Sequence, residues 1–314
     1  MDRRRIAGLT RTEWHHVGVG LLFASPFIVG FLAFTLYPMV VSFYYSFTHF
    51  TGLEPPRWIG LKNYVFMLTQ DDQMHRALAN TAYMVVFDVP AQLLVAFVMA
   101  LLLNVQIRGM AMYRSMYILP AFMPAVPVAV LWTWIFNNNY GIVNHVLGSV
   151  GLPQPIWLGD PNWSKPTLIL LHLWTVGTTA IIYLAALQGV PDHLYEAAAL
   201  DGAGRLRRLW HVTIPMVSAA TFFNLITTMI GTFQIFTEAF ILSGSGTGAG
   251  NTGVGNPQGS LLFYVLYLWD NAFSYLRMGY ASAMAWILFL IVMACTLVML
   301  AGSRRWVYYE GDAA

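Results

Sequence analysis

The charged stretch near the middle of the chain holds the residues whose types and spacing are most informative. Asp192 suits a helix N-cap, and Glu196 falls in the first turn, where the helix dipole stabilises a carboxylate. Alanines at 197–199 favour a helix with a small-residue face, and Gly202 then ends or turns it. We therefore predict a short helix that presents an acidic side chain beside a narrow apolar surface.

A second, basic helix follows this turn. It begins with Arg205, Arg207 and Arg208 and enters an apolar segment near Pro215. Two helices joined by a glycine turn are suited to dock into a groove of a partner protein. They are equally suited to lie on the membrane surface, with the arginines on anionic headgroups. These residues alone do not decide between the two interpretations.

Polar side chains inside apolar runs form the second informative group, because they are costly in a membrane and therefore indicate function. Gln234 and Glu238 are four residues apart, hence on one face of a continuous helix. With the ring of Phe236 beside them, they suit a sugar on a solute path. An equally favoured alternative places Glu238 at the interface, where it reaches water.

Other intramembrane polar and aromatic residues have mainly structural interpretations. Asp88 is expected to pair with a donor in the protein interior, and His172 and Trp174 are expected to pack there. A place on the solute path is the less favoured alternative for His172 and Trp174, and Asp88 also remains a candidate.

Long apolar runs must position these groups. The 314 residues are 58% hydrophobic and 10% charged, whereas soluble domains carry about 25% charge. A bilayer core about 30 Å thick requires roughly 20 apolar helical residues. The runs that qualify are 17–47, 80–103, 115–136, 166–187, 213–242 and 280–301. We therefore predict an all-α polytopic membrane protein with six transmembrane helices, the first one bent near Pro26 and Pro38.

Basic residues are unevenly distributed between the two sets of connections. The termini and the second and fourth connections hold eleven: Arg3, Arg4, Arg5, Arg11, Arg108, Arg114, Arg205, Arg207, Arg208, Arg304 and Arg305. The other connections hold five: Arg57, Lys62, Arg76, Lys165 and Arg277. The positive-inside rule therefore predicts that both termini are cytoplasmic. The expected parts are an N-terminal tail (1–16), a transmembrane domain (17–303) with its charged loop (188–215), and a C-terminal tail (304–314).

The outer connections are expected to be irregular. Residues 137–165 indicate mostly turns, and Gly244–Gly259, with seven glycines in sixteen residues, indicates a flexible loop. Its G-x-G-x-x-G match (Gly248, Gly250, Gly253) lacks the strand, helix and acidic residue of a dinucleotide site. Leu261–Trp269 is too short to span and predicts an interfacial or re-entrant helix, with Tyr264, Tyr267 and Trp269 at headgroup level.

Several classes of function lack their residues. The lysines, Lys62 and Lys165, follow Leu and Ser, so no Walker A motif for ATP hydrolysis is possible in this chain. Cys295 is alone, which excludes a disulfide framework and a cysteine-rich metal site. The basic residues are scattered over short loops, which tells against nucleic acid as a partner.

Residues 196–215 resemble the EAA signature of the permease subunits of binding-protein-dependent ABC importers, E-A-A-x3-G-x9-I-x-L-P. The matching positions are Glu196, Ala197, Ala198, Gly202, Val212, Ile214 and Pro215, with Val212 in place of Ile and Ile214 in place of Leu. Asp201, directly before the glycine, is similar to the carbohydrate-uptake branch of maltose and glycerol-phosphate-type permeases, which typically reads EAA-x-x-D-G-A.

The resemblance extends from about residue 20 to 303. Tyr113–Pro120 looks like the start of the family's third helix, and Gly279–Ala283 like the start of its last helix. Asn137–Leu158, with Gly141, Asn144 and Trp157, resembles its outer loop. One departure is the long stretch Ser243–Gly259, where relatives carry a short Gly-Gly-Pro turn.

The resemblance implies a type I ABC importer permease fold and a subunit that is not an enzyme and binds no cofactor or metal. The implied coupling residues are Glu196, Ala197, Ala198, Asp201, Gly202, Arg205 and Pro215. The implied partners are a second permease in a heterodimer, a cytoplasmic ABC ATPase dimer that binds ATP and Mg, an extracytoplasmic solute-binding protein and membrane lipids. The implied location is the inner or plasma membrane of a prokaryote.

On this basis the chain forms half of an ATP-driven path for a sugar or sugar-like solute. The alternative is a self-sufficient secondary carrier, which usually shows repeat halves or paired broken helices and a titratable midplane cluster. Six helices with two distant carboxylates fit that alternative poorly.

Topology gives the first testable prediction. Single cysteines introduced at Arg3 and Ala314 should react with membrane-impermeant reagents only from the cytoplasmic side, because basic residues are retained there. Labelling of either position in intact cells would contradict this orientation.

Overall fold

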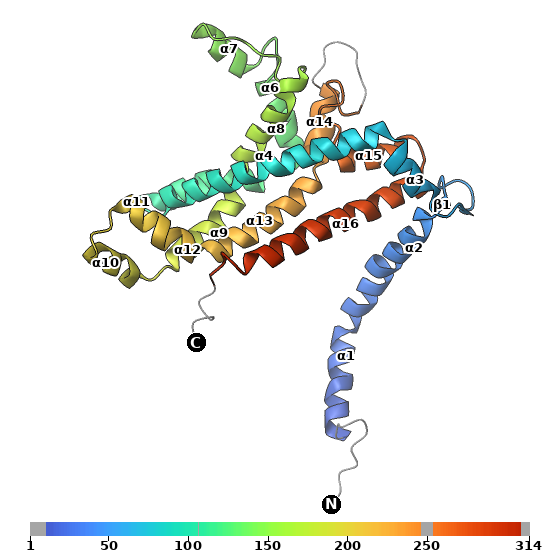
Figure 1. Cartoon of the computed structure of the whole chain (residues 1–314), viewed down its shortest axis with the longest axis horizontal. Helices are drawn as coiled ribbons and strands as arrows, with labels where there is room; N and C mark the ends of the chain where they lie inside the picture. Colours follow the sequence, from blue (N-terminus) through green and yellow to red (C-terminus); the bar gives the residue numbers. More distant parts are fainter. Residues whose placement is uncertain (1–10, 106, 246–253, 309–314) are drawn as a thin grey trace, which may run out of the picture.

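The computed structural model describes residues 11–105, 107–245 and 254–308, and its architecture is a bundle of helices (Figure 1). Within these ranges the strands are a single antiparallel pair, β1 (Thr48–His49) and β2 (Arg57–Trp58). The all-α class is therefore confirmed. The glycine match at Gly248, Gly250 and Gly253 lies outside the described residues, as do Arg3 and Ala314.

Three helical segments are long and apolar enough to cross a membrane without a sharp break. They are Val19–Ser46, Asp72–Leu103 (α4) and Met278–Ser303 (α16). The first begins within α1 (Arg11–Phe31) and continues through the π-helical turn η1 (Leu32–Leu36) and α2 (Tyr37–Ser46). α4 begins eight residues before the predicted run, because Asp71 caps its polar first turn by accepting from the Met74 amide at 3.0 Å.

Three further spans are pairs of helices bent by more than 40°, giving six spans in the described residues if each pair crosses once. The bends are 98° in Met110–Ile135, 48° in Pro161–Gln188 and 64° in Arg205–Phe233. The elements are α5 (Met110–Ile118), η2 (Leu119–Phe122), α6 (Ala125–Ile135), α8 (Pro161–Trp174), α9 (Gly177–Gln188), α11 (Arg205–Arg208), η3 (Leu209–Thr213), α12 (Ile214–Met216) and α13 (Ser218–Phe233). The expectation of continuous helices over 115–136, 166–187 and 213–242 is therefore wrong.

Two of the distortions share one cause. Pro38 follows the π-helical turn η1 by two residues, and Pro215 follows η3 by two. A proline inside a helix lacks the N–H for its own turn and clashes with the carbonyl four residues earlier, so the preceding turn widens. The distortion in the first span therefore lies at Leu32–Leu36, next to Pro38, whereas Pro26 lies within regular α1.

The connection 137–165 is more regular than predicted. Within 137–165 the chain forms α7 (Ile142–Ser149), which projects from the bundle beyond α6 and α8 (Figure 1). The Trp157 indole donates to the Asn144 side-chain oxygen at 2.7 Å and fixes the segment that follows α7 onto this helix. The expectation of mostly turns missed this helix, because it is only eight residues long and lies among the glycines and prolines on which that expectation was based.

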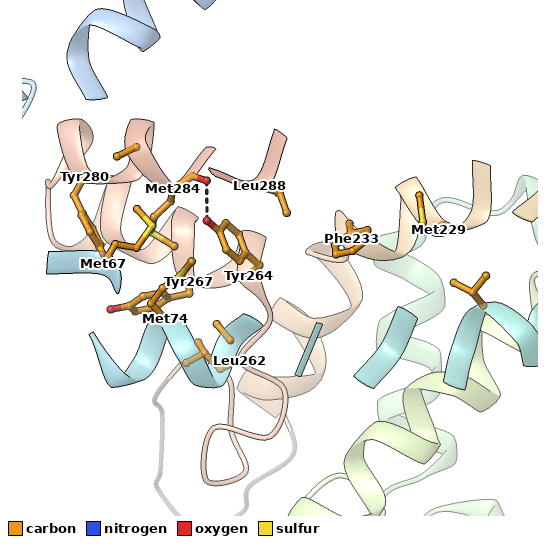
Figure 2. Packing of buried hydrophobic residues seen from close by; sticks show 13 residues of the cluster. Met67, Met74, Met229, Phe233, Leu262, Tyr264, Tyr267, Tyr280, Met284 and Leu288 are labelled. Atoms are coloured by element: carbon orange, nitrogen blue, oxygen red, sulfur yellow. Dashed lines mark hydrogen bonds between the residues drawn. The ribbon is translucent and has the colours of Figure 1, made fainter. Parts of the chain in front are cut away.

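A short, largely buried helix lies between two of the long helices. α15 (Tyr264–Trp269) and the π-helical turn η4 (Asp270–Ser274) pack between α4 and α16, near α3 (Lys62–Thr69). Figure 2 shows Tyr264 directing its hydroxyl to the backbone oxygen of Met284, at 2.8 Å. Tyr264 is 0% and Tyr267 8% exposed, so both rings face the protein core and, contrary to what the sequence had suggested, do not contact lipid headgroups directly.

The residues before α15 are held on α4 by polar contacts. The Asn80 amide donates to the backbone oxygens of Gly259 and Leu262, at 2.8 and 2.9 Å. The hydroxyl of Thr81 accepts from the Tyr264 amide at 2.9 Å. These bonds satisfy backbone groups that are not part of a helix, as an irregular segment at the edge of a membrane requires.

Asp71 joins three elements at this end of the molecule. It is 5% exposed and accepts hydrogen bonds from the hydroxyls of Tyr267 (2.8 Å) and Tyr280, on α15 and α16. Burial, and then the Asp71 carboxylate, raise the pKa of Tyr267, so its hydroxyl remains a proton donor. The carboxylate therefore fastens the start of α4 to both neighbours.

Removing this acceptor gives a stability prediction. Asp71→Ala leaves two buried hydroxyls unpaired and should cost about 3 kcal/mol, because each hydrogen bond to a charged group contributes roughly 1.5–3 kcal/mol. The midpoint of thermal unfolding of the purified protein measures the loss. Asp72→Ala is the matched control, since Asp72 is exposed and contributes at most about 1 kcal/mol through the helix dipole. Equal shifts in the two variants would contradict the role of Asp71.

Candidate functional site

The charged loop folds as a helix attached to the bundle by one face. α10 spans Asp192–Leu200, and the hydroxyl of Tyr195 lies 3.1 Å from that of Thr213. Leu194 and Tyr195 pack against the same cluster as Val212. Packing and a hydrogen bond therefore set the direction in which the other face of α10 points.

That other face is exposed to solvent. Glu196 and Ala197 are exposed, Ala198 is half-buried, and Leu200 is 90% exposed. The next turn adds Leu206, at 74%. Exposed leucines beside a carboxylate and small residues form a surface with both apolar and charged features, as protein interfaces have.

The turn after α10 explains the glycine. The Ala203 amide donates to Ala198 oxygen (2.9 Å) and the Gly202 amide to Ala199 oxygen (3.0 Å), the bond pattern of a Schellman cap. Gly202 has φ +74°, and a Cβ there would meet nothing within 4 Å. The requirement for glycine is therefore conformational, and the space beside it is open.

The beginning of α10 differs from the prediction. Pro191 occupies the N-cap, and Asp192 is the first helical residue, with no capping hydrogen bond from its side chain. The carboxylate still lies in the first turn, where the dipole favours it. The N-cap assignment is wrong because proline suits the helix start and leaves Asp192 one position further in.

The arginine helix leads from this loop into the bundle. Arg205 begins α11, which continues through η3 and α12 to the 64° bend before α13. Pro215 is exposed and directly precedes that bend. The charged turn and the span carrying α13 are thus parts of one bent helical segment.

A second site is a polar cavity of ≈ 520 Å³ between α4, α8, α9 and the α13–α14 junction, where α14 spans Thr237–Ser245. Its polar side chains are mostly hydroxyls and amides. They belong to Gln92, His172, Thr175, Thr179, Thr227, Thr228, Thr232, Gln234 and Glu238. Such a lining offers many hydrogen-bond donors and acceptors inside an otherwise apolar bundle.

The cavity lies where helices break. Thr175 occupies the bend between α8 and α9, and Gln234 ends α13 before α14 begins. Backbone that leaves a helix within a membrane is tolerated where it lines a cavity or is buried in protein. The two breaks and the polar side chains therefore occur together for a physical reason.

A buried carboxylate supports one wall of the cavity. Asp88 is 0% exposed, and its Oδ2 lies 2.6 Å from His172 Nδ1 and accepts from Gln92 Nε2 at 2.9 Å. Both partners line the cavity. The interior donor predicted for Asp88 is therefore present. The carboxylate does not line the cavity itself, but it orients two side chains that do.

The predicted path residues divide into two groups. Gln234 and Glu238 both line the cavity. They do not share a face of one helix, because the helix ends at Gln234 and a new one starts at Thr237. Phe236 packs against Trp269 (5.8 Å between ring centres), and Trp174 against Trp132 (6.2 Å), outside the cavity lining.

The sequence interpretation missed the threonines and Gln92. Thr227, Thr228 and Thr232 lie in an apolar run, where threonine is common and gives no hydropathy signal. The spacing of Thr228 and Thr232, and of Thr175 and Thr179, four residues apart in each pair, was an available indication of a polar face. His172 was expected to pack in the interior, and it lies at the cavity wall with a side chain 13% exposed.

The chain is similar to proteins of a known family. A family profile described as "Binding-protein-dependent transport system inner membrane component" matches residues 92–306, more than half of the chain. The chain belongs to this family. It is a multi-pass inner-membrane permease subunit of an ABC importer and is not itself an enzyme, since a separate ATPase hydrolyses ATP.

Individual relatives cover almost the whole permease. The probable ABC transporter permease protein YesP of Bacillus subtilis is 41% identical over 93% of this chain and 92% of its own length. The lactose transport system permease protein LacF of Rhizobium radiobacter is 32% identical, covering 91% and 94%. These matches confirm the resemblance to carbohydrate-uptake permeases. They favour an ABC importer permease over the alternative of a secondary carrier.

A solved structure has the same fold. A chain of a bacterial alginate ABC transporter, in complex with its alginate pentasaccharide-bound periplasmic protein, superposes with a TM-score of 0.76. It is 24% identical and covers 93% of this chain and 97% of that chain. The type I importer permease fold is thereby confirmed.

The cavity gives a transport prediction. Gln234→Ala, Glu238→Ala and the isosteric Thr232→Val should each lower transport efficiency about tenfold, because each removes one or two hydrogen bonds of roughly 1 kcal/mol. Uptake by the reconstituted importer, measured over a panel of mono- and oligosaccharides, tests this, with subunit assembly and basal ATPase activity unchanged. Glu54→Ala, in the exposed β1–β2 loop, is the control. Unchanged uptake in all three cavity variants would remove these residues from the solute path.

Proposed function

We propose that this permease forms half of the membrane path for a carbohydrate. The observation that carries the proposal is the ≈ 520 Å³ cavity lined by hydroxyl, amide and carboxylate side chains. Sugar hydroxyls exchange their water hydrogen bonds for such groups at little cost. The lactose permease and the alginate transporter among the similar proteins support this class of solute.

The exposed face of α10 is the docking site for the cytoplasmic ATPase dimer. Glu196, Ala197, Ala198, Asp201 and Gly202 present a carboxylate, small residues and a tight turn. Arg205 begins the segment that leads from the docking site into α13. ATP and Mg bind the ATPase, and the permease itself holds no cofactor or metal.

A second permease subunit completes the path as a heterodimer. The span Val19–Ser46 has 0% of its apolar window buried, and its α2 end contacts α16. In Figure 1, α1 diverges from the other spans. A helix held at one end in this way offers a long surface for lipid and for another subunit.

The orientation follows from the positive-inside rule. Both termini and α10 face the cytoplasm, where the arginines of the loop are retained. α7 then faces the opposite side, with Tyr140, Ile142 and Val146 at least half exposed. That lobe offers an apolar surface to the solute-binding protein.

Coupling variants test the docking role. Glu196→Lys reverses a charge on the exposed face, and Gly202→Val forces a β-branched residue into φ +74°, which it rarely adopts. Both should preserve membrane insertion, weaken copurification of the ATPase by tenfold or more (about 1.4 kcal/mol) and abolish solute-stimulated ATP hydrolysis.

A matched control separates strain at the turn from general disturbance of the loop. Gly204 lies two residues later, has φ −67° and also has open space around it, so Gly204→Val should retain more coupling than Gly202→Val. The membrane-surface interpretation expects Glu196→Lys to strengthen binding to anionic lipid. A full ATPase complex and normal uptake in both test variants would refute the docking role.

A further inference from the structure

A second cavity, of ≈ 240 Å³, lies at the end of the bundle remote from α10, where α2 ends and α3 and α16 begin (Figure 1). Three basic side chains from separate segments line it: His49, Lys62 and Arg277. The rings of Phe50 and Phe66 form apolar walls. No lining residue is acidic, so the cavity combines converging positive charge with an apolar boundary.

These cations lack the counter-ions that such a cluster normally has. In the same loop, Arg57 lies 3.6 Å from Glu54, whereas Lys62 and Arg277 have no carboxylate within ion-pair distance in the described part of the chain. Asp71, beyond Tyr280, is 5% exposed and is occupied by two tyrosine hydroxyls. The cavity therefore has a positive charge that the protein itself does not neutralise.

Two helix starts add to this charge. Lys62 is the first residue of α3, and Arg277 occupies the N-cap of α16. Each helix start carries a partial positive charge and amide N–H groups without intrahelical acceptors. Both helix starts are held on the segment after α2: the Gly279 amide donates to the Phe50 oxygen at 2.9 Å, and the Asn63 side-chain amide, at the start of α3, donates to the Thr48 oxygen at 3.0 Å. Helix starts and side chains together favour an anion with several oxygens.

The surroundings identify the level of the cavity in the membrane. It lies where the span Val19–Ser46 ends and the span Met278–Ser303 begins. Trp58 (63% exposed) and Tyr44 (47%) pack together beside it, with 5.9 Å between ring centres. Exposed tryptophan and tyrosine at the ends of spans are typical of the headgroup region.

We propose that this cavity binds the phosphate of an anionic phospholipid in the leaflet opposite α10. Lys62 and Arg277 contact the phosphate oxygens, and Phe50 and Phe66 border the glycerol region. The bound headgroup bridges the starts of α3 and α16. The proposal depends neither on the identity of the transported solute nor on the docking role of α10.

Native mass spectrometry of the assembled importer, titrated with palmitoyl-oleoyl phosphatidylglycerol or the matching phosphatidylcholine, tests the proposal. Lys62→Gln with Arg277→Gln should lower the apparent affinity for phosphatidylglycerol about thirtyfold, with roughly fivefold per cation removed. Binding of phosphatidylcholine should not change. Arg57→Gln, a matched loss of one cation outside the cavity, should leave phosphatidylglycerol binding as it is in the wild type.

Further arms distinguish other sources of the anion. Lys62→Glu supplies a second variant, should the double variant assemble poorly, and should lower phosphatidylglycerol binding more than Lys62→Gln does. If inorganic phosphate at constant ionic strength displaces phosphatidylglycerol in the millimolar range, the site holds free phosphate and the lipid assignment is overturned. Unchanged lipid binding together with weaker affinity for the solute-binding protein would assign the cavity to a protein contact and equally overturn it.

Discussion

A backbone N–H or C=O that leaves its helix inside a bilayer must find a partner within the protein, and this constraint shapes the permease. The breaks in its spans meet one another. Gly177, which starts α9, lies so close to Ile118 and Ala121, shortly before the break between Phe122 and Ala125, that a Cβ would approach them to 3.1–3.2 Å. The break at Thr175 also borders the polar cavity. The bends at Val176 and Val217 are buried in protein (3% and 1% exposed), whereas the 98° bend at Met123 (43% exposed) is open in this chain and available to a neighbouring subunit or to lipid.

α4 is the element to which most other parts are fastened. It is 32 residues long, and buried polar groups occur along its first half, from the N-cap Asp71 to Asp88. Asp71 holds α15 and α16, Asn80 and Thr81 hold the segment before α15, and Asp88 holds α8 through His172. Each contact satisfies a buried group, so removal of one partner would leave another unpaired. The cavity wall that Gln92 and His172 form is thereby tied to a rigid helix.

The sequence was sufficient for features that depend on local chemistry. Apolar runs located the six spans, and Gly202 with the alanines predicted a turn that proves to have φ +74°. It was insufficient where tertiary contacts decide. A hydropathy average over 115–136 cannot detect a 98° bend, because it contains no information on the direction of the backbone. For the same reason Gln234 and Glu238 were assigned to one helix face, although a break between them brings both to the cavity.

α13 joins the two sites of the permease. Its N-terminal end follows the 64° bend that connects it to the arginine helix, and its C-terminal end, at Gln234, lines the cavity together with Thr227 and Thr228. A helix is stiff along its axis, whereas the bend at one end and the break at the other are points where backbone angles can change. A movement of the charged loop would therefore displace the threonines of α13 relative to α4. Because Asp88 and His172 fix the opposite wall, such a displacement would change the spacing of hydrogen-bonding groups across the cavity, and with it the affinity for a solute held between them.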